Sequence, residues 1–315
     1  MELNNNLPIV VTGGTGFLGQ NVIEYLCETG KKCIIVDQKD PSMPVVIQAV
    51  ESGSIGLVVT DLMDRLAVDA ALAELPPRFH LVHVAAVIET TTEVGPRTKE
   101  TLGFHSGISM NMADRWRDRL VSICYTSSWE VYGVPKRLPL DESHETNPFN
   151  VYGVGKLMAE TYLRVFCKSI GIPLTILRLS HIYGPGEWHN KAIPNFIKNC
   201  IAGQAHRLFG GGRDLREFVN ARDVAYAILL SLDRTKDGIF NIAGGQSLNI
   251  RELLEIIQSL FETDLPVVEL PADRPPLDLC FDLNRAKQEL GYKPQITLEE
   301  GLREEIEWFL SIEEI

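Results

Sequence analysis

The segment that most constrains the fold is Ile9–Gly19, an apolar run that ends in glycines and leads into an amphipathic stretch. This order predicts a strand, a tight turn and a helix. Gly13 permits the sharp turn, Gly16 leaves room for a pyrophosphate, and Gly19 lets the helix pack closely on the strand. The first N–H groups of that helix present the positive end of its dipole to the phosphates. The segment therefore predicts the phosphate-binding turn of a dinucleotide site.

The residues that follow complete a βαβ unit. Gly30 ends the predicted helix, residues 32–36 form a second apolar strand, and Asp37 follows that strand 18 residues after Gly19. A carboxylate at this position accepts from both ribose hydroxyls but repels a 2′-phosphate, so Asp37 favours NAD over NADP as the cofactor. The alternative is a glycine-rich turn in an ordinary α/β protein, which the complete unit disfavours.

The bulk properties exclude several classes of protein. The chain has 315 residues, 45% of them hydrophobic, which indicates a globular protein of about two domains. A formal net charge of −12 argues against a general nucleic-acid or anionic-membrane partner. The six cysteines are scattered, the histidines offer no metal pattern, and there is neither a secretory leader nor an apolar run of membrane-spanning length. We expect a cytoplasmic protein with reduced thiols and no metal.

The remaining strands of a doubly wound parallel sheet are predicted from apolar runs at residues 55–60, 81–86, 120–125 and 174–179. Asp61 and Leu62 follow the third strand. Asp61 is placed either to reach an adenine amino group or to cap the next helix, and the residues alone leave these two interpretations even. Ala85 and Ala86 end the fourth strand, and their small side chains leave space beside a ligand.

Groups able to do chemistry follow the predicted strand 120–125. Ser128 and Glu130 stand at its carboxyl edge, and Tyr152 and Lys156 lie one turn apart on a later predicted helix. A free tyrosine has a pKa of about 10 and is a poor base, but a neighbouring ammonium and a positive nicotinamide ring both favour its phenolate. An isolated Tyr-x-x-x-Lys is more often an ordinary helix pair; Ser128 on the strand edge favours a catalytic set.

Motifs over nearly the whole chain carry a family resemblance: Thr12–Gly19, Asp37, Asp61–Leu62, His83–Ala86, Ser127–Ser128, Val131–Gly133, Tyr152, Lys156, Arg178, Tyr183–Pro185, Arg216–Phe218, Asp223, Asn241–Gly244 and Gly291–Pro294. With these motifs the sequence resembles the extended short-chain dehydrogenase/reductase family, in its NAD-dependent sugar-nucleotide epimerase/dehydratase branch. The resemblance implies a Rossmann sheet that binds NAD, a smaller interleaved lobe for a nucleotide-diphosphate sugar, and a homodimer.

The resemblance also implies roles for individual residues. Tyr152 is the expected catalytic base, Lys156 holds the nicotinamide ribose and tunes Tyr152, and Ser128 hydrogen-bonds the reacting sugar oxygen. The expected cofactor contacts are Gly13, Gly16, Phe17, Leu18, Gly19, Asp37, Asp61, Leu62, Ala85, Ala86, Tyr152 and Lys156. Arg216 and Arg274 are expected to clamp the diphosphate, because guanidinium forks suit phosphate oxygens.

Each arginine has a simpler interpretation as a solvated loop charge, and residues 210–216 read as a flexible loop. His181 stands where the family often has an asparagine that touches the substrate. We expect an NAD-binding domain over residues 1–179 plus 217–245, and a nucleotide-sugar lobe over 180–216 plus 246–315. Within the lobe, Asn249 and Thr297 each precede a glutamate at capping-box spacing.

Two departures from the family pattern bear on the reaction. The segment Glu100–Ser106 lacks the asparagine usually found near the cofactor, which weakens a full proton relay. Trp129 stands where 4,6-dehydratases carry the acid of a Thr-Asp-Glu run. Without that acid, elimination of a hydroxyl loses a contribution of about 10² to 10⁴ in rate. Glu130 still matches the dehydratase glutamate and the Ser/Thr-x-Glu of UDP-glucuronate decarboxylases, or it is merely polar at a pocket rim.

The sequence therefore predicts an NAD-dependent nucleotide-sugar epimerase that acts at C4 through a transient 4-keto intermediate. The alternatives are a dehydratase or decarboxylase that uses Glu130, a 4-ketoreductase, and a non-catalytic NAD-binding sensor or scaffold. A non-catalytic binder has no need of the set Ser128, Tyr152 and Lys156, and the enzyme is preferred on that ground.

Overall fold

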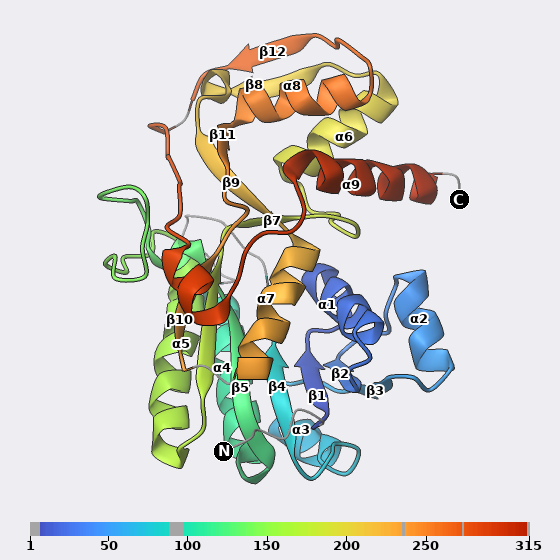
Figure 1. Cartoon of the computed structure of the whole chain (residues 1–315), viewed down its shortest axis with the longest axis vertical. Helices are drawn as coiled ribbons and strands as arrows, with labels where there is room; N and C mark the ends of the chain where they lie inside the picture. Colours follow the sequence, from blue (N-terminus) through green and yellow to red (C-terminus); the bar gives the residue numbers. More distant parts are fainter. Residues whose placement is uncertain (1–6, 88–97, 235–236, 273, 314–315) are drawn as a thin grey trace.

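The structure is a computed structural model that describes residues 7–87, 98–234, 237–272 and 274–313. A central sheet with helices on both faces makes up the larger part, and its strands point toward a smaller lobe of short strands and helices (Figure 1). None of the described helices is long and apolar enough to cross a membrane.

The strands of the central sheet are β1 (Ile9–Thr12), β2 (Cys33–Asp37), β3 (Gly56–Val59), β4 (Phe79–His83), β5 (Leu120–Ser128), β6 (Leu174–Leu179) and β10 (Gly238–Ile242). They pair in parallel in the order β3-β2-β1-β4-β5-β6-β10. The order of connection reverses between β1 and β4, which opens a crevice at their carboxyl ends. The predicted doubly wound parallel sheet is confirmed.

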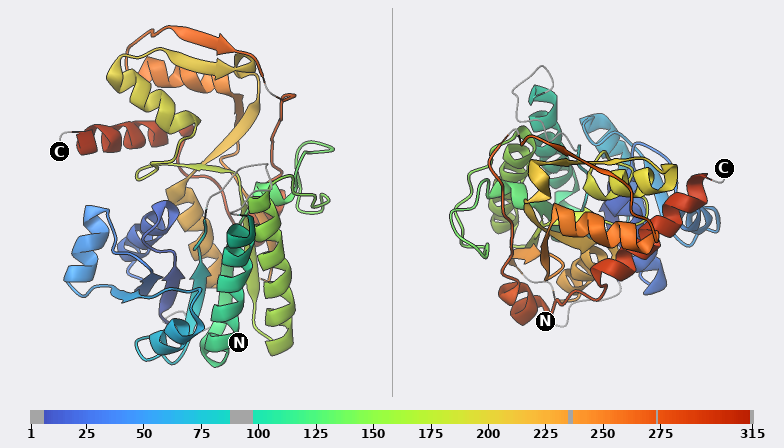
Figure 2. Two further views of the ribbon diagram at one scale, coloured as in Figure 1. Left: turned by 180° about the vertical axis from the view of Figure 1, so that it is seen from behind. Right: turned by 90° about the horizontal axis from the view of Figure 1, so that it is seen from above.

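The helices around the sheet are α1 (Phe17–Glu28), α2 (Pro44–Glu51), α3 (Arg65–Ala71), α4 (Thr98–Trp116), α5 (Val151–Ile170) and α7 (Ala221–Arg234), with the short helices η1 (Arg117–Arg119) and η2 (Trp129–Val131) beside β5. Helices α1 and α7 cover one face, and α3, α4 and α5 cover the other (Figure 2). Side chains alternate along a strand, so Val11 joins the core under α1 and Val10 joins the core under α4.

Helix α5 carries two of the predicted catalytic residues. Asn150 caps its start by accepting from the N–H of Gly153 at 2.8 Å, and Gly171 ends it in a left-handed conformation with φ of 74°. Its apolar stripe is buried against the sheet. The helix is therefore fixed at both ends and along one side, which holds Tyr152 and Lys156 in place.

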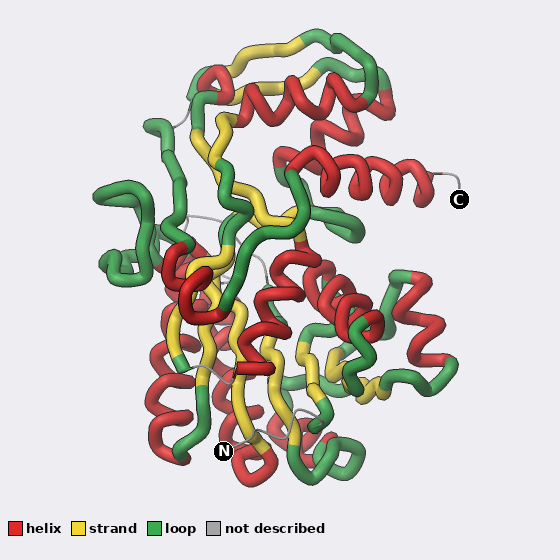
Figure 3. The backbone as a smooth tube through the Cα atoms, in the orientation of Figure 1, coloured by secondary structure: helices red, strands yellow, loops and turns green. Residues whose placement is uncertain are grey.

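The elements of the smaller lobe are β7 (His181–Tyr183), α6 (Ala192–Ala202), β8 (His206–Phe209), η3 (Gly210–Gly212), β9 (Leu215–Asn220), β11 (Ser247–Asn249), α8 (Ile250–Leu260), β12 (Val267–Leu270) and α9 (Leu298–Glu313). Strand β9 lies between β7 and β11, and β8 pairs with β12 (Figure 3). The capping boxes predicted at Asn249 and Thr297 are confirmed, with reciprocal bonds to Glu252 and Glu300.

The prediction of a flexible loop over residues 210–216 is wrong. These residues form η3 and the start of β9, where Arg216 lies opposite Leu248 and is only 8% exposed. Two charged residues, Arg216 and Glu217, are buried in this strand, so the usual alternation of apolar and polar residues is missing. Their partners compensate the burial: Glu217, for example, accepts from the backbone N–H of Gly245 at 2.7 Å.

Two segments lie on the other side of the expected domain boundaries. Residues 217–220, expected in the NAD-binding domain, belong to strand β9, which pairs with β7 and β11 in the sheet of the smaller lobe. The short helix η4 (Ala286–Leu290) returns to the larger part, where Ala286, Leu290 and Tyr292 join the core shared with α1 and α7. The two parts are therefore interleaved through more crossings than the sequence indicated.

Candidate functional site

The glycine turn after β1 has the geometry of a phosphate site. Gly13 has φ of +73°, and a Cβ on it would lie 2.5 Å from the Cα of Ala85. A Cβ on Gly19 would lie 2.0 Å from the Gly13 carbonyl oxygen, whereas one on Gly16 would meet nothing closer than 3.5 Å. Close packing therefore requires two of the glycines, and the third borders open space. No side chain caps this end of α1, so its first N–H groups are available to an anion.

Asp37 is fixed at the carboxyl end of β2 beside this turn. Its Oδ2 accepts from the Thr15 N–H at 3.0 Å, and its Oδ1 accepts from the Gln38 N–H at 2.7 Å. A carboxylate held by two backbone groups keeps further lone pairs for a ribose diol. The turn, the free helix end and this carboxylate fit an adenine dinucleotide.

Asp61 does not cap α3, which corrects one of the two interpretations of this residue. Asp64 is the cap and accepts from the Leu66 N–H at 2.8 Å. Asp61 instead accepts from the Gln38 side-chain amide at 2.7 Å, which places its carboxylate near the ends of β2 and β3. Leu62 is buried in the core under α4.

The Lys156 ammonium is buried between two tyrosines, with 2% of the residue exposed. Its Nζ donates to the Thr126 carbonyl at 2.8 Å and lies 5.0 Å from the ring centroid of Tyr125 and 5.7 Å from that of Tyr152. Burial lowers the pKa of Lys156 to about 7. Burial and the nearby Glu130 carboxylate raise the pKa of Tyr152 above its usual value.

The expected tuning of Tyr152 by Lys156 stays a prediction. The sequence predicts that Lys156 and a bound nicotinamide together favour the Tyr152 phenolate, whereas burial and Glu130 act in the other direction and raise the pKa of Tyr152. Burial lowers the pKa of Lys156, whose ammonium donates to the neutral Thr126 carbonyl, and the charge of Glu160 opposes this fall. The positive nicotinamide ring is then the remaining source of stabilisation for a phenolate.

Ser128 and Glu130 stand at the carboxyl end of β5, as predicted. The Ser128 Oγ accepts from the Glu130 N–H at 3.2 Å, a bond that leaves the hydroxyl proton able to donate. The Glu130 carboxylate accepts from the Asn150 side-chain amide. Burial raises the pKa of Glu130, although Asn150 and the charge of Lys191 oppose the rise. The site therefore pairs a hydroxyl donor with a carboxyl group that binds protons readily.

Trp129 belongs to a cluster of aromatic rings above this serine. Its centroid lies 5.3 Å from the His181 ring and 6.0 Å from the Phe149 ring, and His181 lies 5.7 Å from Phe218. Burial, Arg216 and other cationic charge hold the pKa of His181 well below its usual value, so its ring is neutral. The His181 Nδ1 is buried and has no partner among the described residues. The cluster thus offers an apolar wall with one polar atom.

The two arginines expected to bind a diphosphate do lie together. Arg216 and Arg274 both contact Asp214, at 2.7 Å and 2.6 Å. Arg216 is buried within β9, and Arg274 is half exposed on the segment after β12. Residues 58 positions apart in the chain therefore form one cationic site.

His105, which no sequence pattern singled out, lies beside Tyr152. Its ring meets the Tyr152 ring edge-on at 5.3 Å, and its Nε2 bonds the Val87 carbonyl at 3.1 Å. Gly155 makes the contact possible, because a Cβ there would lie 2.8 Å from the imidazole. Burial and Lys156 lower the pKa of His105 to about 3. The available signal was its position inside the segment noted for lacking an asparagine.

Another buried network holds motif residues that do not face the crevice. Arg178 forms a double hydrogen bond with Glu160 at 3.0 and 2.8 Å, and its guanidinium lies 4.7 Å from the ring centroid of Tyr132. The Tyr132 hydroxyl donates to Asn241 at 2.6 Å. These contacts join α5, β6, η2 and β10, so this part of the family resemblance reflects structural support of the site.

Comparison with known proteins agrees with this geometry. The model of the NAD dependent epimerase/dehydratase family matches residues 9–243. A putative UDP-glucose 4-epimerase of Methanocaldococcus jannaschii is 28% identical and covers 95% of this chain and 97% of its own. A dTDP-glucose 4,6-dehydratase of Streptomyces antibioticus is 25% identical, with 96% and 92% covered. A solved UDP-N-acetylglucosamine 4-epimerase of Methanobrevibacter ruminantium is 27% identical, with a TM-score of 0.87 and 98% and 99% covered.

Proposed function

The chain belongs to the NAD dependent epimerase/dehydratase family, and we propose that it inverts C4 of a nucleotide sugar through a transient 4-keto intermediate. The observation that carries this choice is Trp129. The position between Ser128 and Glu130 holds a buried indole that packs on His181, so it offers no carboxylic acid to protonate a leaving hydroxyl. A similarly sized relative is a putative UDP-glucose 4-epimerase.

In this proposal the protein moves one proton and holds the sugar. Tyr152 takes the proton of the C4 hydroxyl, and Ser128 donates a hydrogen bond to the same oxygen. The glycine turn, Asp37 and Lys156 hold NAD, which when bound supplies the removal of hydride from C4 and its return to the opposite face. Tyr152 then gives its proton back to the C4 oxygen.

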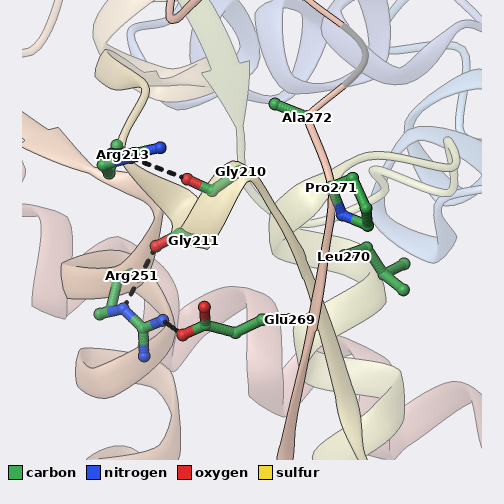
Figure 4. A pocket seen from close by; sticks show the side chains of 8 residues that line it. All are labelled: Gly210, Gly211, Arg213, Arg251, Glu269, Leu270, Pro271 and Ala272. Atoms are coloured by element: carbon green, nitrogen blue, oxygen red, sulfur yellow. Dashed lines mark hydrogen bonds and ion pairs between the residues drawn. The ribbon is translucent and has the colours of Figure 1, made fainter.

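Inversion requires the sugar to turn while the rest of the substrate stays bound. Arg216 and Arg274 grip the diphosphate, so binding energy from the remote nucleotide retains the intermediate. A cavity of about 670 Å³ adjoins these arginines along the chain and is lined by η3, Arg213, Arg251 and residues 269–272 (Figure 4). Its volume is in the range of small-molecule sites, and we assign the nucleoside to it.

A second candidate function, dehydration or decarboxylation, is favoured by Glu130. This carboxyl group is near enough to Tyr152 to raise its pKa, and its own pKa is raised by burial. Such a group is able to take a proton from C5 of a 4-keto sugar. Relatives named as 4,6-dehydratases support this alternative.

Mass spectrometry on UDP- and dTDP-sugars incubated with enzyme and NAD separates these reactions. We expect an isomer of unchanged mass, resolved from substrate by chromatography, with no deuterium on carbon when the reaction runs in D₂O. Loss of water identifies a dehydratase and loss of carbon dioxide a decarboxylase. In a parallel incubation of a 4-keto sugar with NADH, net NADH consumption identifies a 4-ketoreductase. NAD binding without any product identifies a sensor or scaffold. Each of these other outcomes overturns the epimerase proposal.

Assembly and location are also proposals. The family resemblance implies a homodimer, and α4 and α5 lie side by side with Met110, Met158 and Val165 exposed, so we place the contact there (Figure 2). Light scattering measures the size. All six cysteines are free, which fits the reduced cytoplasm that the sequence predicts.

A further inference from the structure

The carboxylate of Asp214 joins the two arginines of the proposed diphosphate site through a single atom. Its Oδ2 accepts from Arg216 Nη2 at 2.7 Å and from Arg274 Nη2 at 2.6 Å. Its Oδ1 accepts from the Leu277 N–H at 3.3 Å, which ties the carboxylate to the segment that carries Arg274. Asp214 therefore holds the two guanidinium groups together across two separate chain segments.

The Nη1 groups of both arginines donate to backbone carbonyls and not to Asp214. Arg216 Nη1 donates to the carbonyl groups of Leu215, at 3.0 Å, and Leu277. Arg274 Nη1 donates to the Pro275 carbonyl at 3.0 Å. A guanidinium has five N–H donors in a fixed plane, so these bonds to the backbone fix its orientation. A phosphate oxygen that bridges both Nη2 atoms needs the position of the Asp214 Oδ2.

The charge balance of the group follows from the same contacts. Partial burial acts to raise the pKa of Asp214, but Arg274 and Arg216 outweigh it and lower that pKa, so the carboxylate is ionised at neutral pH. The group therefore carries two positive charges and one negative charge. A diphosphate meets a net charge of about one instead of two, and it competes with a carboxylate for the same N–H groups.

We propose that Asp214 is an internal stand-in for a phosphate oxygen, which sets the affinity of this enzyme for the diphosphate of its substrate. It keeps Arg216 and Arg274 in the binding geometry and gives up its contacts when a diphosphate enters. The inference rests on the proposed function in taking these arginines as the diphosphate site. Its consequence is a site that is organised before binding and that releases product readily.

The test is calorimetric titration of the NAD-loaded enzyme with inorganic pyrophosphate, UDP and dTDP. In Asp214→Asn we expect the Kd of each to fall about tenfold, which corresponds to about 1.4 kcal/mol. The control is Asp278→Asn: Asp278 lies close enough to act on the charge of Arg216, but its Oδ1 accepts from the Leu215 N–H at 3.1 Å. The variant Asp278→Asn removes the same formal charge as Asp214→Asn, and we expect the Kd of each ligand to change less than about threefold.

Several outcomes overturn the inference. If Asp214→Asn binds pyrophosphate more weakly than the wild type, the carboxylate is required to position the arginines. If Asp214→Asn and Asp278→Asn bind it more tightly by the same factor, the effect is one of general charge. Absence of pyrophosphate binding in every variant removes the anion site itself. If Asp214→Asn melts well below the wild type, Asp214→Ser replaces it. A wild-type enzyme that binds pyrophosphate but neither UDP nor dTDP contradicts the proposed function. The ratio of the pyrophosphate Kd values of the wild type and Asp214→Asn still decides the role of Asp214.

Discussion

Lys156 and Arg216 are both buried cations, at 2% and 8% exposed, but they have different partners. Lys156 is held by the Thr126 carbonyl and by aromatic rings, and burial brings its pKa to about 7. Burial also lowers the pKa of Arg216, but from a much higher usual value, and the contact with the Asp214 carboxylate opposes the fall, so the guanidinium keeps its charge. The proposed catalytic region therefore has a cation whose pKa lies near neutral pH, whereas the proposed binding region has one whose charge is fixed.

The difference fits the tasks that we propose for the two regions. Proton transfer is most efficient when groups titrate near the working pH, and burial without an ion-pair partner moves a lysine there. Binding a diphosphate needs constant charge and a rigid fork of donors, which an arginine with a carboxylate partner supplies. The same burial thus gives reactivity in one place and stable recognition in the other.

The largest expected effect is loss of the base in the catalytic region. Tyr152→Phe removes only the hydroxyl, so we expect turnover to fall by about 10² to 10⁴ while NAD affinity stays nearly unchanged. The matched control is Tyr125→Phe, because the Tyr125 ring also lies near Lys156, while its hydroxyl is buried with no partner among the described residues. Steady-state kinetics and NAD titration measure both variants. Full activity in Tyr152→Phe contradicts the role of Tyr152 as the base.

Exchange of the cation type in the binding region comes next. Arg216→Lys keeps the charge but loses the planar fork, and hydrogen bonds to charged groups contribute about 1.5 to 3 kcal/mol each. We expect KM to rise about 10- to 100-fold with kcat within about threefold. The control is Arg303→Lys, an exposed arginine paired with Glu299 at 2.8 Å, which should leave KM unchanged. A fall in kcat at constant KM would contradict a binding role.

The two regions also differ in how far sequence predicts them. The βαβ order and the Tyr152–Lys156 spacing are local, so pattern alone located the sheet and the catalytic pair. The clamp depends on Asp214 meeting Arg274 across 60 positions, and no local pattern records that contact. Strand β9 was missed because its buried residues include charges. The rise that burial causes in the pKa of Tyr152 is not visible in a sequence, which shows only the spacing of Tyr152 and Lys156.

Linkage between protonation and stability tests the charge of Lys156. Its pKa is about 7 in the folded chain and about 10.4 in the unfolded chain, so between these values the unfolded state binds one more proton. This residue therefore makes the free energy of unfolding rise with pH over that window, by at most about 1.4 kcal/mol per pH unit.

We expect Lys156→Met to lose this rise, as measured by urea unfolding between pH 7 and about 10. Lys136→Met is the control, since Lys136 is an exposed lysine paired with Glu145. Its pH dependence should match that of the wild type. Parallel curves for the wild type and Lys156→Met would show that Lys156 keeps its full charge in the folded state, and the contrast with Arg216 would disappear.

The smallest expected effect concerns Glu130, which stands beside the base but has no assigned step in epimerisation. Glu130→Gln keeps the size of the side chain and its ability to accept from Asn150. It also removes the negative charge that raises the pKa of Tyr152, so the base becomes a slightly stronger acid and the pH profile of kcat should shift toward lower pH. An epimerase should therefore retain turnover within about threefold at neutral pH, because the proton and the hydride are exchanged at C4 alone. A dehydratase or decarboxylase loses its C5 base in the same variant. If turnover falls by about 10² or more in this variant, and the wild-type product is lighter than the substrate, Glu130 takes part in the reaction.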